Sequence, residues 1–103
     1  RGKLQNAAEL KKVTDRIPDG ATVVAQNETG LKLLRRCQVF NVPGPEKADF
    51  YLFDRENFHR YESPEELNSL LMRLLRDPDY RFERYGKGIL LFRKLTPSVR
   101  TKR

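Results

Sequence analysis

The sequence predicts a small α/β domain on a mixed sheet, with elements in the order α-β-α-β-β-α-β-β and an antiparallel hairpin at the end. Three observations lead to this class. Residues 22–26 are apolar and β-branched, residues 67–75 carry leucines at helical spacing, and residues 89–92 are apolar throughout. A chain of 103 residues suits one modest core. We therefore expect two or three layers, with helices on the faces of the sheet.

The chain opens with a helix that we expect over residues 4–16. Three apolar residues with the spacing i, i+3 and i+7 define its buried stripe, namely Leu10, Val13 and Ile17. The stripe is thin, so this helix depends on its neighbours for stability. Pro18 ends it, and Asp19-Gly20 forms the turn that follows.

Two short strands with a helix between them are expected next. Thr22–Gln26 is a buried strand, and Asn27 can cap a helix over residues 28–36 because its side-chain oxygen can accept a free N–H of the first turn. Cys37–Phe40 forms the second strand. A strand, a helix and a second strand predict a right-handed parallel crossover.

The third strand and the main helix follow a Pro-Gly-rich loop at residues 41–47. The strand spans residues 48–54, and residues 55–62 form a polar connection. Residues 63–66 read Ser-Pro-Glu-Glu, which is a capping box with proline at the first helical position. The apolar face of this helix then consists of Leu67, Leu70, Leu71, Leu74 and Leu75.

The chain ends in a hairpin and a basic tail. Tyr80–Tyr85 alternates as a strand does, residues 86–88 form the turn, and Ile89–Phe92 returns as a fully apolar strand. Residues 95–103 lack core residues and are expected to be mobile. In the predicted sheet the first strand lies between the second and the third, and the hairpin lies beyond the third.

Polar residues at the ends of the first and third strands form the candidate site. Parallel strands bring their carboxyl ends to one edge, so Asn27, Glu28, Asp54 and Arg55 should meet where ligands bind in open α/β sheets. An anion could rest on the N–H groups after Asn27, with Arg55 as its counter-charge.

A structural interpretation of the same four residues stays open. Asn27 would cap the helix, Glu28 would complement the helix dipole, and Asp54-Arg55 would be a solvated strand end. The chain contains neither G-x-G-x-x-G nor G-K-[ST], so it has no dedicated phosphate loop. We expect no cofactor and no metal.

Other reactive residues indicate packing rather than chemistry. His59, the only histidine, has no neighbouring pattern that supplies a nucleophile or an orienting partner. Cys37 is the only cysteine, so an internal disulfide and a cysteine-based zinc site are excluded, and a buried inert thiol is expected. Glu65 and Glu66 are adjacent in a helix and do not face each other.

The net charge of +7 is concentrated at the two ends of the chain. Residues 1–16 hold five basic residues against two acidic ones, and residues 93–103 hold five basic residues and no acid. Residues 17–92 hold 11 basic and 12 acidic residues. A nucleic-acid groove would place its charge on the folded body, among aromatics. Basic ends fit solvated termini or a position near anionic lipid headgroups, and nucleic acid is not the expected partner.

Several segments in order resemble a known family over about residues 10–94. They are Ile17-Pro18-Asp19-Gly20-Ala21, Val23-Val24-Ala25-Gln26-Asn27, Leu33-Leu34-Arg35-Arg36, Ala48-Asp49-Phe50-Tyr51-Leu52-Phe53-Asp54 and Gly88-Ile89-Leu90-Leu91-Phe92-Arg93. Together they resemble the C-terminal soluble domain of polytopic prokaryotic predicted membrane proteins of unknown function. That family is similar to C-type integral-membrane glycosyltransferases, which use lipid-linked sugar donors. The chain departs from the pattern at residues 41–47 and at Glu28-Thr29-Gly30.

The resemblance implies a membrane-anchored parent with transmembrane helices before Arg1. Catalytic acids of such glycosyltransferases lie in the membrane half, so it assigns no catalytic residue to this chain. The resemblance implies a domain that faces outside the cell, whereas Arg1, Lys3, Lys11 and Lys12 close to a membrane span favour the cytoplasm.

The expected organisation is therefore a juxtamembrane helix at 1–16, an α/β domain at 17–94 and a basic tail at 95–103. The main functional hypothesis is a non-catalytic accessory, acceptor-binding or assembly domain of a membrane protein. Its partners would be the transmembrane part of its own chain, lipid headgroups, and a lipid-linked sugar or acceptor. The alternatives are a module that binds a sugar or nucleotide sugar at the Asn27/Asp54 edge, and a basic nucleic-acid binder.

Overall fold

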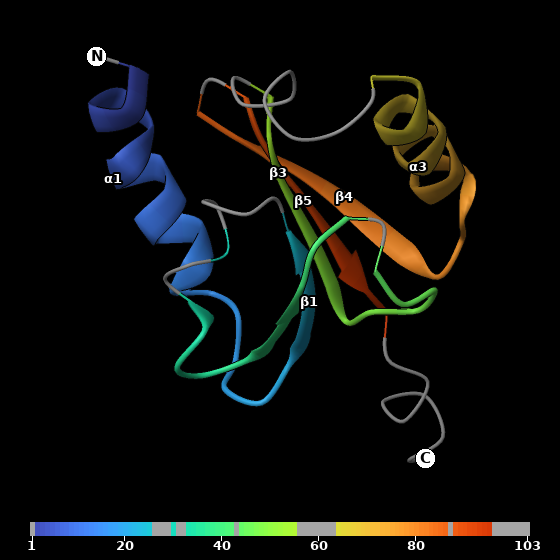
Figure 1. Cartoon of the computed structure of the whole chain (residues 1–103), viewed down its shortest axis with the longest axis horizontal. Coiled ribbons are helices and arrows are strands. Elements are labelled where there is room, and N and C mark those ends of the chain that lie inside the picture. Colours follow the sequence, from blue (N-terminus) through green and yellow to red (C-terminus); the bar gives the residue numbers. More distant parts are fainter. Residues whose placement is uncertain are drawn as a thin grey trace.

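The computed structural model describes residues 2–25, 30, 33–42, 44–55, 64–86 and 88–95. In these ranges the chain forms one five-stranded mixed sheet and two α-helices (Figure 1). The elements are α1 (Gly2–Thr14), β1 (Thr22–Ala25), β2 (Gln38–Phe40), β3 (Phe50–Asp54), α3 (Pro64–Arg76), β4 (Tyr80–Tyr85) and β5 (Ile89–Lys94). The predicted α/β class is confirmed.

The strands are arranged in the order β2-β1-β3-β5-β4. β1 is parallel to both β2 and β3, whereas β5 is antiparallel to β3 and to β4. This is the predicted order, with the first strand between the second and third and the hairpin beyond the third. β2 and β4 are the two edge strands, and β1, β3 and β5 lie in the interior of the sheet.

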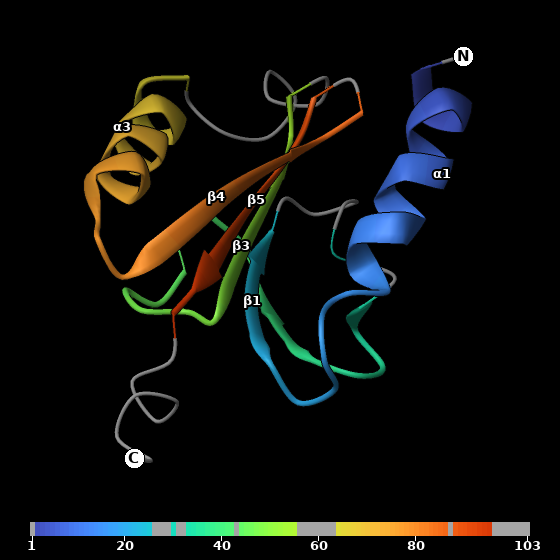
Figure 2. The same cartoon turned by 180° about the vertical axis from the view of Figure 1, so that it is seen from behind.

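The two helices cover opposite faces of the sheet and give it three layers (Figures 1 and 2). All five residues of β3 are buried, as expected for a strand with both faces covered. Alternate β3 residues enter different cores. Phe50 and Leu52 pack on the α1 side, and Tyr51 and Phe53 pack on the α3 side.

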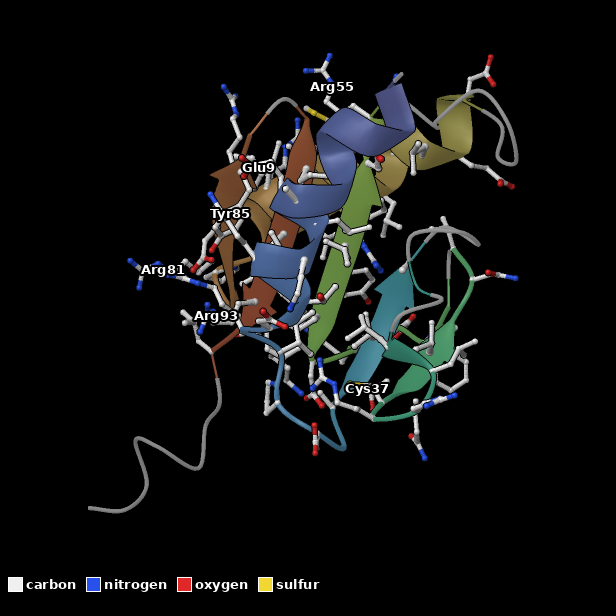
Figure 3. The ribbon with its side chains drawn as sticks, turned by 90° about the vertical axis from the view of Figure 1, so that its left-hand side faces the viewer. Glu9, Cys37, Arg55, Arg81, Tyr85 and Arg93 are labelled. Atoms are coloured by element: carbon white, nitrogen blue, oxygen red, sulfur yellow. The ribbon has the colours of Figure 1, made fainter. Side chains whose placement is uncertain are left out.

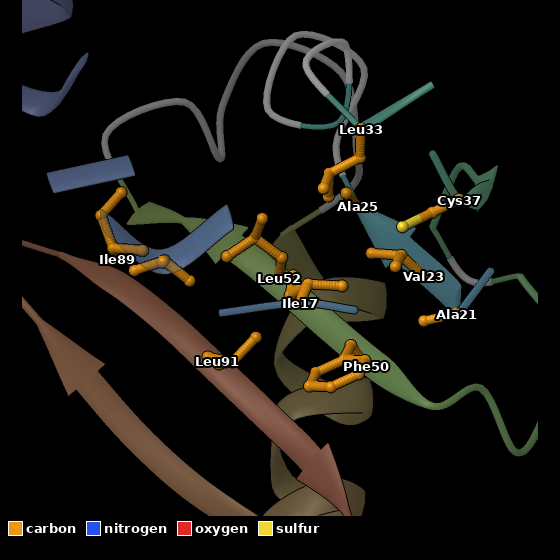
Figure 4. Packing of buried hydrophobic residues seen from close by; sticks show 11 residues of the cluster. Ile17, Ala21, Val23, Ala25, Leu33, Cys37, Phe50, Leu52, Ile89 and Leu91 are labelled. Carbon is orange, nitrogen blue, oxygen red and sulfur yellow. The ribbon is translucent and has the colours of Figure 1, made fainter. Parts of the chain in front are cut away.

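The core on the α1 side combines the end of α1 with the interior strands (Figure 4). Its buried members are Val13, Ile17, Ala21, Val23, Ala25, Leu33, Cys37, Phe50, Leu52, Ile89 and Leu91. Val13 and Ile17 are fully buried and Leu10 is partly buried, so the thin stripe of the first helix is the surface that packs. The core on the α3 side has as its buried members Val24, Ala48, Tyr51, Phe53, Leu67, Leu70, Leu74, Tyr80, Leu90 and Phe92.

Some boundaries differ from the predicted ones. α1 ends at Thr14 instead of residue 16, where the Thr14 hydroxyl donates to the Lys11 carbonyl at 3.1 Å. β5 continues to Lys94 because β4 begins at Tyr80, and the two residues pair. Leu75 is 55% exposed, although its spacing places it on the apolar stripe, and it is the residue before the last one of α3.

Two predicted segments fall largely on residues outside the described ranges. The helix expected over residues 28–36 is described only at residue 30 and from Leu33 onward, where the chain turns and the Cys37 N–H donates to the Leu33 carbonyl at 2.8 Å. The tail is described only at Leu95, whose N–H donates to the Asp79 carbonyl at 2.7 Å.

The direction of the elements gives the domain two distinct ends. The N-terminal end of α1, the carboxyl ends of β1 and β3, and the β4–β5 turn lie together at one end (Figures 1 and 2). The carboxyl ends of α1 and β5 lie at the other. A ligand at the predicted sheet edge would therefore lie at the same end as the start of α1.

Candidate functional site

The described half of the predicted sheet-edge site lies at the end of β3. Asp54 is the last residue of this strand, is only 4% exposed, and pairs in register with Ile89. Asp54 also takes part in a polar or electrostatic interaction. Asp54 is thus buried at the strand end and is not exposed to solvent. Asn27 and Glu28 lie outside the described residues, so their side of the site is a prediction.

Arg55 is the exposed member of the edge. Its N–H donates to the Gly88 carbonyl at 2.9 Å, which fixes its backbone to the turn that starts β5. Gly88 has φ of +128°, and a Cβ at this glycine would lie 3.4 Å from Cβ of Arg55. The Arg55 side chain projects beyond the end of β3 (Figure 3). A fixed backbone with an exposed guanidinium is a favourable arrangement for meeting an anion.

The register of the parallel strands agrees with a shared edge. Val24 pairs with Tyr51 and Ala25 with Leu52, so β1 and β3 advance together toward the end that carries Asp54 and Arg55. The carboxyl end of β1, at Ala25, therefore lies beside β3. This is the topological position where open α/β sheets bind ligands.

The two other reactive residues named from the sequence are distant from that edge or undescribed. Cys37 is buried and unpaired, and its thiol donates to the Pro18 carbonyl at 3.4 Å. Cys37 belongs to the core on the α1 side, which confirms the prediction of a buried thiol. His59 lies outside the described residues.

A polar network that the sequence analysis did not identify joins α1 to the hairpin. Arg16 Nη1 donates to the Tyr85 hydroxyl at 3.0 Å, and the Tyr85 hydroxyl donates in turn to Glu83. Arg93 completes it with Nη2 at 3.2 Å from a Glu83 carboxylate oxygen. Figure 3 shows Tyr85 and Arg93 on the side of the sheet that faces α1.

The strand pattern contained a signal for this network. Arg81, Glu83 and Tyr85 alternate along β4 and so share one face, which in the pairing register is the face of Arg93. Arg16 could not be added from the pattern, because its position depends on how α1 crosses the sheet.

The network shifts the acidities of two of its members. Burial opposes ionisation of Glu83, but the Tyr85 hydrogen bond and the Arg93 charge outweigh it and hold the pKa of Glu83 below its usual value. Burial and the hydrogen bond to the Glu83 carboxylate raise the pKa of Tyr85. Glu83 is therefore ionised and Tyr85 is neutral at pH 7, which suits a structural tie.

The described ranges contain neither a cluster of metal ligands nor a membrane-spanning helix. Within them, no three histidine, cysteine, aspartate or glutamate residues are grouped so as to hold a metal ion. None of the helices in these ranges has the length and apolar character needed to cross a membrane. Comparisons with protein-family models, with curated proteins and with solved structures found no match for this chain.

Proposed function

We propose that this chain is a non-catalytic accessory domain of a multi-pass membrane protein similar to C-type glycosyltransferases. In this proposal the sheet edge at Asp54 and Arg55 contacts the anionic head group of a lipid-linked sugar or acceptor. The observation that carries the proposal is that this edge lies at the same end of the domain as the N-terminal end of α1 (Figure 1).

Because the edge and the start of α1 lie at the same end, both can face the membrane surface at once. A membrane span that leads into α1 would place the start of this helix closest to the bilayer. The carboxyl ends of β1 and β3 would then face the same surface, because they point toward the start of α1 (Figure 2). A lipid-linked phosphate at the bilayer surface would lie within reach of the Arg55 guanidinium.

The chemistry of the edge fits a phosphate group better than a neutral sugar alone. A guanidinium forms two parallel hydrogen bonds to a phosphate and binds it more strongly than it binds a neutral acceptor. Arg55 is exposed, and its backbone is already held by the Gly88 carbonyl, so binding has to order the side chain but not the backbone of this residue. Asp54, beside it, is buried at the end of the strand.

A supporting role fits the described acidic and phenolic side chains better than catalysis does. Glu83 and Tyr85 hold the hairpin to α1. Asp77 pairs with Lys47 at 3.1 Å and accepts the Asp79 N–H at 2.9 Å. These contacts account for the positions of the four side chains without a catalytic role.

Vesicle flotation tests this proposal. The chain should float with vesicles of a neutral lipid that contain a polyprenyl phosphate, and the amount bound should exceed that with vesicles lacking the phosphate. Equal recovery from both vesicles would reject recognition of the head group. Incubation with nucleotide sugars should give no hydrolysis or transfer, and turnover would contradict the non-catalytic assignment.

The coding sequence upstream of Arg1 tests the other half of the proposal. It should encode several hydrophobic segments of transmembrane length, about 20 residues each. An upstream sequence without such segments would reject the membrane parent while leaving the vesicle result to stand on its own.

A further inference from the structure

The outer edge of β4 has no strand beside it within the described parts of the chain. β4 is the last strand in the order β2-β1-β3-β5-β4, and in these ranges it pairs with β5 alone. Figure 3 shows the Arg81 side chain of β4 pointing away from the sheet at this margin. β4 has six residues, and an uncovered edge of this kind is where another strand can add to a sheet.

Alternate residues of β4 direct their backbone groups to this outer edge. The Leu95 N–H donates to the Asp79 carbonyl at 2.7 Å, so the residue just before β4 turns its backbone toward β5. In an antiparallel pair this direction alternates from one residue to the next. The residues of β4 whose backbone groups face outward are therefore Tyr80, Phe82 and Arg84.

The side chains along the edge carry opposite charges and one exposed ring. Arg81 and Glu83 share the α1 face, whereas Phe82 lies on the α3 face and is 39% exposed. Arg81 lies opposite Arg93 of β5, which is an unfavourable pairing of like charges. Glu83 binds Arg93, and the Arg81 side chain makes no hydrogen bond or ion pair with another described residue. Arg81 is thus a cation whose acidic partner is missing from the described chain.

Charge complementarity selects one way to pair this edge with a second copy of itself. Antiparallel pairing about a two-fold axis normal to the sheet keeps each side chain on its own face and lets the outward backbone groups meet. Registers centred on Phe82 and on Glu83 keep most of β4 paired. The register centred on Glu83 sets this carboxylate against its own copy. The register centred on Phe82 sets Arg81 of each copy opposite Glu83 of the other.

We propose that two copies of this chain associate through β4, with the two-fold axis at Phe82, and join their sheets into one continuous sheet. On the α1 face, Arg81 of each copy pairs with Glu83 of the other. On the α3 face, the two Phe82 rings meet and lose their exposure to solvent. The Phe82 backbone groups bond to each other across the axis, and each Arg84 N–H donates to the Tyr80 carbonyl of the other copy.

The twist of the sheet lets both copies turn their Arg55 edges toward one surface. Neighbouring strands rotate by about 20–25°, so β4, three strands away from β1, lies about 60–75° from the direction of β1. A two-fold axis normal to the sheet at β4 then lies about 15–30° from that direction, and both β1 carboxyl ends stay on the same side. β5 separates β3 from the paired edge, so association leaves Arg55 exposed. The dimer and the binding of a head group are therefore tested separately.

Sedimentation equilibrium of the chain at increasing concentration tests for the dimer. Because one strand edge is a small contact, we expect a weak, reversible monomer–dimer equilibrium. A chain that stays monomeric up to about 1 mM overturns the proposal.

Hydrogen exchange at low and high concentration identifies the surface that pairs. Exchange of the Phe82 and Arg84 amides should slow as the dimer forms, because these N–H groups face outward in the monomer. Exchange of the Arg81 and Glu83 amides should change little, because they already face β5. A dimer in which the Phe82 amide stays unprotected uses another surface and rejects the proposal.

Charge reversal at Arg81 separates association from folding. Arg81→Glu sets two carboxylates against each other at both symmetry-related contacts and should weaken the dimer by about tenfold or more. The same substitution places a carboxylate opposite Arg93 within the chain, so the thermal stability of the monomer should not fall. Arg35→Glu is the matched control, an equal charge change at an exposed residue in the turn before β2. Equal weakening by both substitutions would show a non-specific charge effect and reject the interface.

A mixture of two variants tests the register. Glu83→Arg alone should also weaken self-association, because it sets two cations opposite each other. Mixed with Arg81→Glu, it should form a heterodimer, since each copy then meets the opposite charge at both contacts. Folded variants that do not associate when mixed reject the register. If Glu83→Arg does not fold, the comparison of Arg81→Glu with Arg35→Glu decides the proposal.

Discussion

The Tyr85 hydroxyl lies 3.0 Å from Nη1 of Arg16, although the two residues are 69 positions apart in the chain. The Arg16 guanidinium also lies 5.6 Å from the centroid of the Tyr85 ring. One side chain thus ties the turn after α1 to the last residue of β4. The direction of α1 relative to the sheet edge, on which the proposed function depends, is held in part by this contact.

Removing the Tyr85 hydroxyl should loosen that tie without changing the core. Tyr85→Phe should lower the free energy of unfolding by about 1 kcal/mol. The substitution removes the hydrogen bond from Arg16 and the hydrogen bond to Glu83. Urea unfolding measures the change. A double-mutant cycle with Arg16→Gln should show coupling between the two positions. Purely additive losses would mean that the contact does not contribute in solution.

Gly44 and Gly20 form a matched pair for a packing test. Both have positive φ, +65° and +86°, so alanine is strained at each. A Cβ at Gly44 would lie 2.5 Å from Cγ2 of the buried Val24, whereas nothing lies within 4 Å of a Cβ at Gly20. Gly44→Ala should therefore cost about 1–3 kcal/mol more than Gly20→Ala in thermal or urea unfolding. Equal costs would contradict the close approach of this loop to β1.

Tyr51 should govern the order of the loop that precedes β3. Its hydroxyl lies 2.7 Å from the Glu46 carbonyl and 2.9 Å from that of Pro45, and it accepts the Ala48 N–H at 3.4 Å. Tyr51→Phe should cost about 1–2 kcal/mol, because buried backbone groups lose a partner. Hydrogen exchange should accelerate at Ala48 and stay unchanged in the hairpin. Unchanged exchange at Ala48 would show that the hydroxyl is dispensable.

Glu83 should make the free energy of unfolding depend on pH in the acid range. Its folded-state pKa is below the usual 4.5, so its contribution is complete above pH 4.5 and is lost as the pH falls through the lower folded-state value. The free energy of unfolding should therefore fall less between pH 7 and pH 3 in Glu83→Gln than in the parent chain. Glu46→Gln is the control, and parallel curves for the parent chain and Glu83→Gln would contradict the network.

The fold was predictable where local patterns act alone. The capping box and leucine stripe gave α3, and alternation with a glycine turn gave the β4–β5 hairpin. Boundaries differ from the predicted ones where strand pairing sets them. β5 extends to Lys94 because this residue pairs with Tyr80 of β4. Leu75 shows the same limit, since a helical pattern cannot reveal where the sheet beneath it ends.

The candidate sites divide in the same way. The place of Asp54 and Arg55 at the end of β3 was predictable because they follow a recognisable strand. That this edge binds a ligand stays a prediction from the rule for parallel sheets. The polar network of Arg16, Tyr85, Glu83 and Arg93 was predictable only in part. It joins the turn after α1 to the β4–β5 hairpin, and the position of Arg16 depends on how the helix crosses the sheet.

NMR titration with a short-chain polyprenyl phosphate most directly tests the central claim, that the Arg55 edge binds a lipid-linked head group. The amides of Arg55 and Gly88 should shift and saturate, and Arg55→Gln should weaken binding by about tenfold. Arg76→Gln, an exposed substitution at the far end of α3, should bind as the parent chain does. Stationary Arg55 and Gly88 amides, or equal affinity in the parent chain and Arg55→Gln, would contradict the account.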